Sequence, residues 1–337
     1  MQPARKLLLR PFAGNRLRTT PLGIGMAALG RPGYINLGHG EDYQGSRTVE
    51  AMESRAFEVL DTAWNAGVRY FDAARSYGRG EAFLGAWLRR RQIPAQDVVI
   101  ASKWGYTYTA DWRIDATHHE VKDHSPAVLL RQWQETKANL GDRLDLYQIH
   151  SATFDSGVLE NRDVHRELAR RKGEGTLIGL TLSGPRQAEV LERAMSVEVD
   201  GVRLFDAVQA TWNLLEPSAA PALEAAHASG LGVIVKESLA NGRLTTRNRG
   251  PEFAARQLAL ATLAARFDVT TDAVALAAAL ARPWADVVLS GAATPAQLKS
   301  NLRSLGVSWD EEAEFQALPL AEEPEAYWRK RSDLAWN

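Results

Sequence analysis

The sequence predicts an α/β fold, a (β/α)8 TIM barrel, on two observations. Short apolar strand patterns alternate with amphipathic helix patterns almost to the end of the 337-residue chain, which is typical of a parallel sheet built from βα units. Eight such strand patterns occur, and eight parallel strands close this barrel. No Ser- or Pro-rich linker divides the chain, so we expect one domain over residues 1–337.

The expected elements follow one another in a regular order. An N-terminal hairpin is expected ahead of the barrel. Between the strands, apolar residues recur at helical spacing; one such helix contains Val128 and Leu140 and ends at Gly141, a residue type common at helix C-termini. In chain order the strands are expected to end in Gly23–Met26, Tyr70–Asp72, Val99–Ala101, Leu146–Ile149, Ile178–Thr181, Ala207–Ala210, Val233–Val235 and Val287–Leu289.

Three segments interrupt the alternation of strands and helices. Residues 31–47 form a Gly-rich stretch, residues 104–125 are rich in aromatic residues and histidine, and residues 319–337 form a tail with three large aromatic residues. Loops this long are usually functional or disordered. We expect long loops at the barrel mouth and the C-terminal tail over the active site. Simple packing of the tail on the barrel explains its aromatic residues equally well.

Composition excludes several classes of function. The formal net charge is −1, which gives no reason to expect nucleic acid or an anionic membrane as a partner. The chain has no cysteine, which excludes disulfides and thiolate nucleophiles. The basic N-terminus, residues 1–10, has an apolar run only from Leu7 to Leu9, too short for a signal peptide, and no span fits a membrane. We therefore expect a cytoplasmic protein; the sequence gives no oligomeric state.

Four polar residues stand at or just after predicted strand ends: Asp72, Tyr77, Lys103 and His150. In a βα barrel these ends converge on the active-site mouth. Each residue alone has an ordinary explanation, as a turn residue, a surface tyrosine, a solvated lysine or a core histidine. Together on one face they favour catalysis, because they can deliver a proton to a carbonyl while a bound cofactor delivers hydride.

The chemistry assigns a role to each of the four. A free tyrosine has a pKa near ~10, too high for easy proton donation at neutral pH. The ammonium of Lys103 is expected to lower the pKa of Tyr77, and Asp72 to hold Lys103 in place. His150 is expected to orient the carbonyl oxygen or share the proton. Tyr77 would then be the acid for reduction and the base for oxidation.

Three segments around these residues resemble motifs of the aldo-keto reductase family. Residues 70–78, YFDAARSYG, resemble its Asp-Thr-Ala-x-x-Tyr-Gly signature; Ser102-Lys103 resembles its Ser-Lys pair; and residues 145–150, DLYQIH, resemble its Asp-Leu-x-x-x-His. The likeness runs from about Leu22 to about Leu305. The resemblance implies a barrel that binds a nicotinamide cofactor without a Rossmann fold, with the four residues as its catalytic tetrad.

The resemblance also implies a set of cofactor-binding residues. Ser183 and Gln209 match residues that hold the nicotinamide carboxamide, residues 238–244 match the loop over the pyrophosphate, and residues 290–302 match the adenosine phosphate end. Without the resemblance, the last segment would be an ordinary capped helix. The cofactor-binding residues implied in this way are Gly25, Met26, Ser183, Gly184, Gln209, Lys236, Ser238, Leu239, Asn241, Arg243, Gly291, Ala293, Gln297 and Asn301.

The chain departs from the family pattern at three points. Lys236 stands where family members often have an aromatic residue against the nicotinamide, and Gly184 replaces a usual asparagine. The arginine expected near the 2′-phosphate is missing, because Ala293 and Gln297 occupy its positions. The resemblance implies NADPH as the cofactor, and because this arginine is missing, use of NADH stays open as an alternative.

The expected substrate is a small carbonyl compound or a sugar. The aromatic residues Trp104, Tyr106, Trp112 and Trp328 are predicted to line its pocket. The histidines of residues 118–124 do not form a His-Glu-x-x-His motif, so no metal site is expected. Three hypotheses stay open: a carbonyl reductase acting on aldehydes or ketones, an NAD(P)+-dependent sugar or polyol dehydrogenase, and a nicotinamide-binding subunit that senses redox state.

Overall fold

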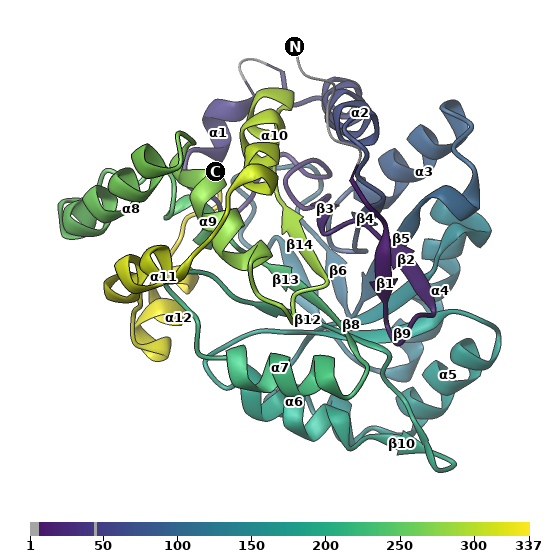
Figure 1. Ribbon diagram of the computed structural model, residues 1–337. Helices are drawn as coiled ribbons and strands as arrows, with labels where there is room; N and C mark the ends of the chain where they lie inside the picture. The colour runs from purple at the N-terminus through teal and green to yellow at the C-terminus, as the bar shows by residue number, and fades with distance from the viewer. Residues whose placement is uncertain (1–6, 44–45) are drawn as a thin grey trace.

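The computed structural model describes residues 7–43 and 46–337 and contains a closed barrel of eight parallel strands surrounded by helices (Figure 1). The last barrel strand pairs with the first, which closes the sheet. The eight predicted strands are confirmed. In chain order they are β3 (Leu22–Gly25), β4 (Tyr70–Asp72), β5 (Val99–Trp104), β8 (Leu146–Ala152), β9 (Leu177–Leu182), β12 (Ala207–Thr211), β13 (Gly232–Lys236) and β14 (Val287–Ser290).

The outer layer consists of helices that bury one apolar face each against the barrel. The predicted helix before Gly141 is confirmed: Ser125 caps its start, and Gly141 ends it with a φ of +65°. A short antiparallel pair, β10 (Glu198–Val199) and β11 (Val202–Arg203), lies outside the barrel. The surrounding helices are α2 (Val49–Asn65), α3 (Gly80–Arg90), α4 (Pro126–Leu140), α5 (Arg162–Gly173), α6 (Gln187–Met195), α7 (Ala220–Ala228), α8 (Ala254–Arg266), α9 (Thr271–Leu280) and α10 (Pro295–Leu302).

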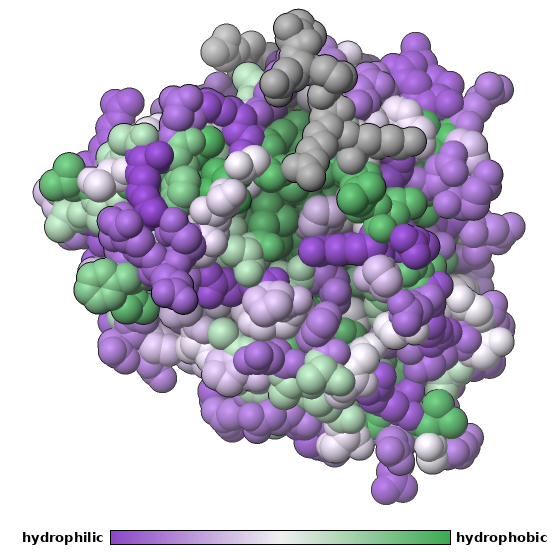
Figure 2. Space-filling model, in the orientation of Figure 1, coloured by the Kyte–Doolittle hydropathy of each residue, from purple (hydrophilic) through white to green (hydrophobic). Residues whose placement is uncertain are grey.

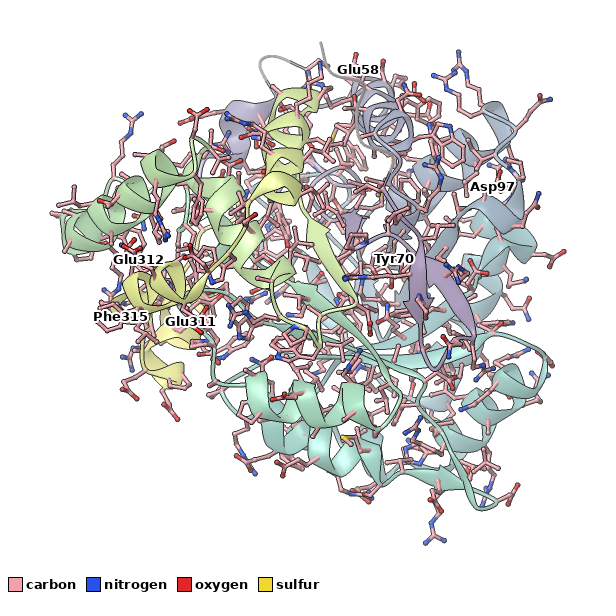
Figure 3. All side chains as sticks on the ribbon, viewed as in Figure 1. Glu58, Tyr70, Asp97, Glu311, Glu312 and Phe315 are labelled. Carbon is pink, nitrogen blue, oxygen red and sulfur yellow. The ribbon has the colours of Figure 1, made fainter. Side chains whose placement is uncertain are left out.

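The predicted N-terminal hairpin, β1 (Arg10–Phe12) and β2 (Leu17–Thr19), closes one end of the barrel (Figure 1). Phe12 is fully buried, with its ring centroid 6.0 Å from that of Tyr70, which Figure 3 labels in the middle of the barrel. Gly232 has no side chain because the Phe12 ring fills that space. The residues packed around Phe12 are Ala13, Tyr70, Val99, Ala101, Leu146, Leu177, Ala207, Ile234, Val287 and Leu289.

Three aspartates at the same end of the barrel make the same kind of hydrogen bond to a neighbouring strand. Each stands directly before a strand, and its Oδ2 accepts the backbone N–H of a residue near the start of a neighbouring strand. A buried N–H without a partner would be costly, so these carboxylates help to fix how the strands are staggered. The pairs are Asp145 with Ile100 at 2.8 Å, Asp206 with Ile178 at 3.0 Å, and Asp286 with Val233 at 2.8 Å.

The three long segments contain more regular structure than the sequence predicted. Residues 31–47 include the short helix α1 (His39–Asp42), and residues 104–125 include the antiparallel strands β6 (Tyr106–Tyr108) and β7 (Glu120–Lys122). The tail follows α11 (Glu311–Ala317) and contains α12 (Pro324–Ser332). Its last residue, Asn337, exchanges two backbone hydrogen bonds of 3.2 Å with Tyr34. The tail is thereby held against residues 31–47, beside the barrel mouth.

The face of the molecule shown in Figure 2 is mostly hydrophilic, with apolar side chains at its left edge, where α8 and α11 lie in Figure 1. Leu258 on α8 and Phe315 on α11 are 70% and 74% exposed, and Figure 3 shows Phe315 at that edge. Among the described residues, no helix is long and apolar enough to cross a membrane. The cytoplasmic location stays a prediction.

Candidate active site

The four predicted catalytic residues meet at the mouth of the barrel. Asp72 ends β4, Lys103 lies near the end of β5, His150 lies in β8, and Tyr77 follows β4 just before α3. The Lys103 Nζ is bonded to Asp72 Oδ1, donates to the Ala73 carbonyl at 3.0 Å, and lies 5.0 Å from the Tyr77 ring centroid. The Tyr77 and His150 rings meet edge to face at 5.6 Å.

Two glycines allow the backbone at Tyr77 to come this close to the barrel. Gly78 has a φ of +55°, a conformation that favours glycine, and Gly30 lies against the Tyr77 carbonyl, where any side chain would overlap it. The Arg79 N–H donates to the Gly30 carbonyl at 2.7 Å. The sequence YGRG after the barrel strand thus fixes the position of the phenol.

Asp72 is a buried carboxylate with all of its partners in place. Its Oδ2 accepts hydrogen bonds from Gln148 Nε2 at 3.2 Å and Gln209 Nε2 at 3.0 Å, while Lys103 takes Oδ1. Pairing and hydrogen bonding are what make a buried charge tolerable. Sequence reasoning missed Gln148, although it stands two residues before His150 and therefore faces the barrel interior.

The ionisation of the phenol differs from the expectation. Burial raises the pKa of Tyr77 above its ordinary value, Asp72 raises it further, and Arg31 opposes this shift. Lys103 does not produce the lower pKa that the sequence suggested, because burial and the Asp72 carboxylate shift the pKa of the phenol the other way. Burial, together with the nearby cations of which Lys103 is the strongest, lowers the pKa of His150 well below its ordinary value, so its ring is neutral.

A cavity of about 450 Å³ opens beside these residues and is walled by Asp72, Tyr77 and His150 on one side. This volume lies in the range of small-molecule sites. Two cavity residues that directly follow barrel side chains, Ser151 and Glu237, have positive φ values of +54° and +56°. Strained backbone of this kind clusters at functional sites.

Of the predicted cofactor-binding residues, eight line this cavity and six do not. Gly25, Ser183, Gln209, Lys236, Ser238, Leu239, Asn241 and Gly291 line it. The six outside it are Met26, Gly184, Arg243, Ala293, Gln297 and Asn301. Met26 is fully buried in the core, and the Arg243 guanidinium is bound to Glu322 at 2.7 Å. Asn301, on α10, contacts the hydroxyl of Ser290 on β14 at 2.9 Å and so joins the helix to the barrel.

Gln297 belongs to a separate polar network beyond the cavity. Its Nε2 donates to Asp42 Oδ1 at 2.6 Å, and its Oε1 accepts the Ala293 N–H at 2.8 Å. Arg247, from the loop after β13, donates to Asp42 Oδ2 at 3.1 Å and to the Gly38 carbonyl at 2.9 Å. The sequence has no arginine at positions 293 or 297, but Arg247 from a different loop binds the same carboxylate as Gln297.

One of the four predicted substrate-pocket residues lines the cavity. Tyr106 lies on its wall, with its ring centroid 4.9 Å from that of His150. Trp104 does not, because side chains alternate along β5: Lys103 faces the mouth and Trp104 faces away, where it is fully buried. This alternation was a signal in the sequence that could have excluded Trp104.

The other two predicted pocket residues are also used elsewhere. Trp112 donates its indole N–H to the Arg47 carbonyl at 2.7 Å, and Trp328 is buried in α12. In their place the cavity has residues that sequence reasoning missed: Arg31, Tyr34, Glu120, Glu237, Arg331 and Trp336. Of these, only Trp336 carried a signal, as an aromatic residue of the tail expected at the mouth.

The histidines of residues 118–124 have structural contacts. The His119 ring stacks on Trp336 at 3.9 Å, and His124 Nε2 contacts the His150 carbonyl at 2.9 Å. Within residues 7–43 and 46–337 no group of three metal-ligating side chains comes together.

The residues of the cavity fit a nicotinamide cofactor. Ser238 Oγ and Asn241 Oδ1 are buried in its wall without a hydrogen-bond partner among the described residues. A buried polar atom left unpaired is costly, so these two atoms call for a polar ligand. Ser183 and Gln209, with a hydroxyl and an amide, can bind a carboxamide in the same cavity.

The family assignment agrees with this site. The model of the aldo/keto reductase family matches residues 21–317, so this chain belongs to that family of oxidoreductases. NAD(P)H-dependent carbonyl reduction is typical of the family.

Individual proteins are similar over most of their length. A D-threo-aldose 1-dehydrogenase from Pseudomonas sp. is 26% identical over 317 residues, 84% of this chain and 94% of the relative. The norsolorinic acid reductase stcV from Emericella nidulans is 26% identical over 325 residues, 92% and 79% of the two chains. The holo form of the aldo-keto reductase AKR11C1 from Bacillus halodurans superimposes with a TM-score of 0.68 at 20% identity, covering 94% of this chain and 97% of that one.

Proposed function

We propose that this protein reduces aldehydes or ketones to alcohols with NADPH, with Tyr77 as the proton donor. The observation that carries the proposal is that Tyr77, His150 and Asp72 line one cavity, with Lys103 paired to Asp72. Ser183 and Gln209 lie in the lining of the same cavity, where they suit the carboxamide of a nicotinamide.

The mechanism follows from the protonation states of these side chains. A nicotinamide cofactor bound in the cavity supplies the hydride. The neutral His150 offers a ring N–H to orient the carbonyl oxygen, and the Tyr77 hydroxyl donates its proton to that oxygen as hydride arrives at the carbon. In the reverse direction the Tyr77 phenolate accepts the proton.

The network around Asp42 supports NADPH as the cofactor. Arg247 and Gln297 converge on the Asp42 carboxylate, which is the kind of anion site that a phosphate monoester also satisfies. Phosphate sites of βα barrels often lie after the seventh and eighth strands, where Arg247 and Gln297 stand. We infer that the 2′-phosphate takes the place of the Asp42 carboxylate on these two side chains, whereas NADH lacks this contact.

A second candidate, oxidation of a sugar or polyol with NAD(P)+, is favoured by the polarity of the cavity. Its wall carries hydroxyl and charged groups beside the catalytic residues, among them Ser151, Glu120 and Arg331. Groups of this kind can pair with several hydroxyls of a substrate. The similarity to a D-threo-aldose 1-dehydrogenase points the same way.

The test is the change in NADPH and, separately, NADH absorbance with a reactive aromatic aldehyde, and with a panel of aldoses in the oxidative direction. We expect aldehyde turnover that is faster with NADPH than with NADH and is lost in Tyr77→Phe. Turnover of the aldoses alone would support the dehydrogenase. Cofactor binding with neither reaction would contradict both candidates and favour a redox-sensing subunit.

A further inference from the structure

Arg31 is an arginine buried in the wall of the catalytic cavity. It follows β3 in the segment of residues 31–47 and is 3% exposed. Its Cζ lies 5.3 Å from the ring centroid of Tyr77, 5.1 Å from that of Tyr34, and 4.7 Å from that of Trp336. A cation at this distance from an aromatic ring is attracted to it.

Specific contacts hold the guanidinium in this position. Its Nη1 donates to the Ser76 carbonyl at 3.1 Å, next to Tyr77 in the chain, and to Glu120 Oε2 at 2.8 Å. Its Nε is buried without a hydrogen-bond partner among the described residues. Arginine stays charged even when it is buried. A fixed positive charge therefore lies beside the phenol.

We propose that Arg31 is a positioning residue that acts through Tyr77: its charge stabilises the phenolate and so sets the acid strength of the proton donor. This inference rests on the proposed function, in which Tyr77 exchanges the proton with the substrate oxygen. Lys103 and Arg31 lie 5.0 Å and 5.3 Å from the centroid of the Tyr77 ring, so Arg31 adds a second cation beside the phenol, from the loop after β3.

The anionic groups around the phenol work against Arg31. Asp72 on β4, Glu120 on β7 and Glu237 after β13 each raise the pKa of Tyr77, in addition to its burial. Glu237 is held by Arg331, and Glu120 by Arg31 itself.

Three other titratable groups face Tyr77. Lys103 on β5 is paired with Asp72, His150 on β8 is neutral, and burial raises the pKa of Tyr34 so that its phenol stays protonated. Arg31 opposes the upward shift of the Tyr77 pKa, so its removal should move the titration of the phenol upward.

The experiment replaces Tyr77 by 3,5-difluorotyrosine, whose phenol titrates at lower pH, and follows its protonation by 19F NMR without cofactor. We expect Arg31→Met to raise the pKa of this phenol by about one pH unit. Arg31→Lys keeps a cation and should raise it by less than half as much. Glu120→Gln removes an anion from the same pair and should lower it.

The opposite signs separate electrostatics from a loss of packing. An unchanged titration in Arg31→Met, or a rise of equal size in all three variants, would overturn the inference. The readout needs no turnover, so its failure is distinct from failure of the proposed function. A shift of the phenol pKa without carbonyl reduction would support the role of Arg31 and contradict the proposed reductase. Carbonyl reduction without a shift of the phenol pKa would support the reductase and contradict the role of Arg31.

Discussion

The two ends of the barrel are built from the same strands, yet they hold opposite kinds of side chain. At the hairpin end the interior is apolar and packed around Phe12; at the mouth it contains charges and amides. On each of four strands, a residue of the apolar layer at the hairpin end is followed two positions later by a residue of the polar layer at the mouth. These pairs are Tyr70 and Asp72, Ala101 and Lys103, Leu146 and Gln148, and Ala207 and Gln209.

The difference shows how the chain separates stability from chemistry. Side chains two residues apart on a strand face the same side, so each strand can supply one packing residue and one functional residue to the interior. The costly burial of Asp72 and Lys103 is confined to one layer, and the layer below it is apolar. Changes at the two ends should therefore have different consequences.

Lys103→Met should break the mouth layer most severely. It leaves the Asp72 carboxylate buried without its cation, so we expect a stability loss of about 3 kcal/mol, measured by chemical denaturation. Turnover should fall by at least about 100-fold, because the donor site loses its organisation. The double variant with Asp72→Asn should recover stability but not turnover; recovery of both would contradict the assigned role.

Phe12→Ala should damage the other layer alone. Removing a buried phenylalanine costs about 3 kcal/mol, visible as a lower denaturation midpoint. The kcat of the folded fraction should stay the same, since Phe12 lies at the opposite end of the barrel from Tyr77. Leu258→Ala, at an exposed site on α8, is the matched control and should change stability by less than about 0.5 kcal/mol. A fall in the kcat of Phe12→Ala without a loss of stability would contradict the claim that the hairpin end serves stability and the mouth serves catalysis.

Arg247→Met tests the network at the edge of the mouth. We expect the Kd for NADPH to rise about 10-fold, as for the loss of one charge-assisted contact, while the Kd for NADH changes by less than about twofold. Quenching of protein fluorescence measures both constants. Arg256→Met, on the neighbouring helix α8, should leave both unchanged. Equal weakening of the two cofactors would mean that Arg247 does not read the 2′-phosphate.

Asp145→Asn is the smallest chemical change of the four: it removes one carboxylate charge at the hairpin end of the barrel. Burial raises the pKa of Asp145 to about 6, so the folded protein loses stability as its carboxyl ionises between about pH 4 and pH 6. Asparagine removes this loss while it can still accept the Ile100 N–H. We expect the variant to be no different near pH 4 and to gain stability over the unmodified protein by about 1.4 kcal/mol per pH unit up to about pH 6, measured by urea unfolding. A variant less stable at pH 8 would show that the charge itself is needed.

The barrel strands were predictable because their pattern is local. Alternating strand and helix patterns gave all eight strands, and the polar residues at their ends, Asp72, Lys103 and His150, gave the mouth layer. A place at the end of a strand was not enough to predict a pocket residue. Trp104 stands at the end of β5, but side chains alternate along the strand and that of Trp104 points away from the mouth.

The loop contributions were not predictable, because they depend on contacts between distant parts of the chain. Arg31 reaches Glu120, Arg247 reaches Asp42, and Asn337 pairs with Tyr34. No periodicity in the sequence relates such residues. For the same reason the sequence did not show that Arg247 lies beside Gln297, where an arginine was expected: the two residues are 50 positions apart and both bind Asp42.

The central claim is that the mouth of the barrel carries out proton transfer through Tyr77. The most direct test measures NADPH binding and carbonyl turnover together in Tyr77→Phe. The account predicts a Kd for NADPH within about twofold of the unmodified protein and a kcat lower by at least about 1,000-fold. A Tyr77→Phe variant that turns over at the full rate would contradict it, and so would a loss of turnover fully explained by a loss of cofactor binding.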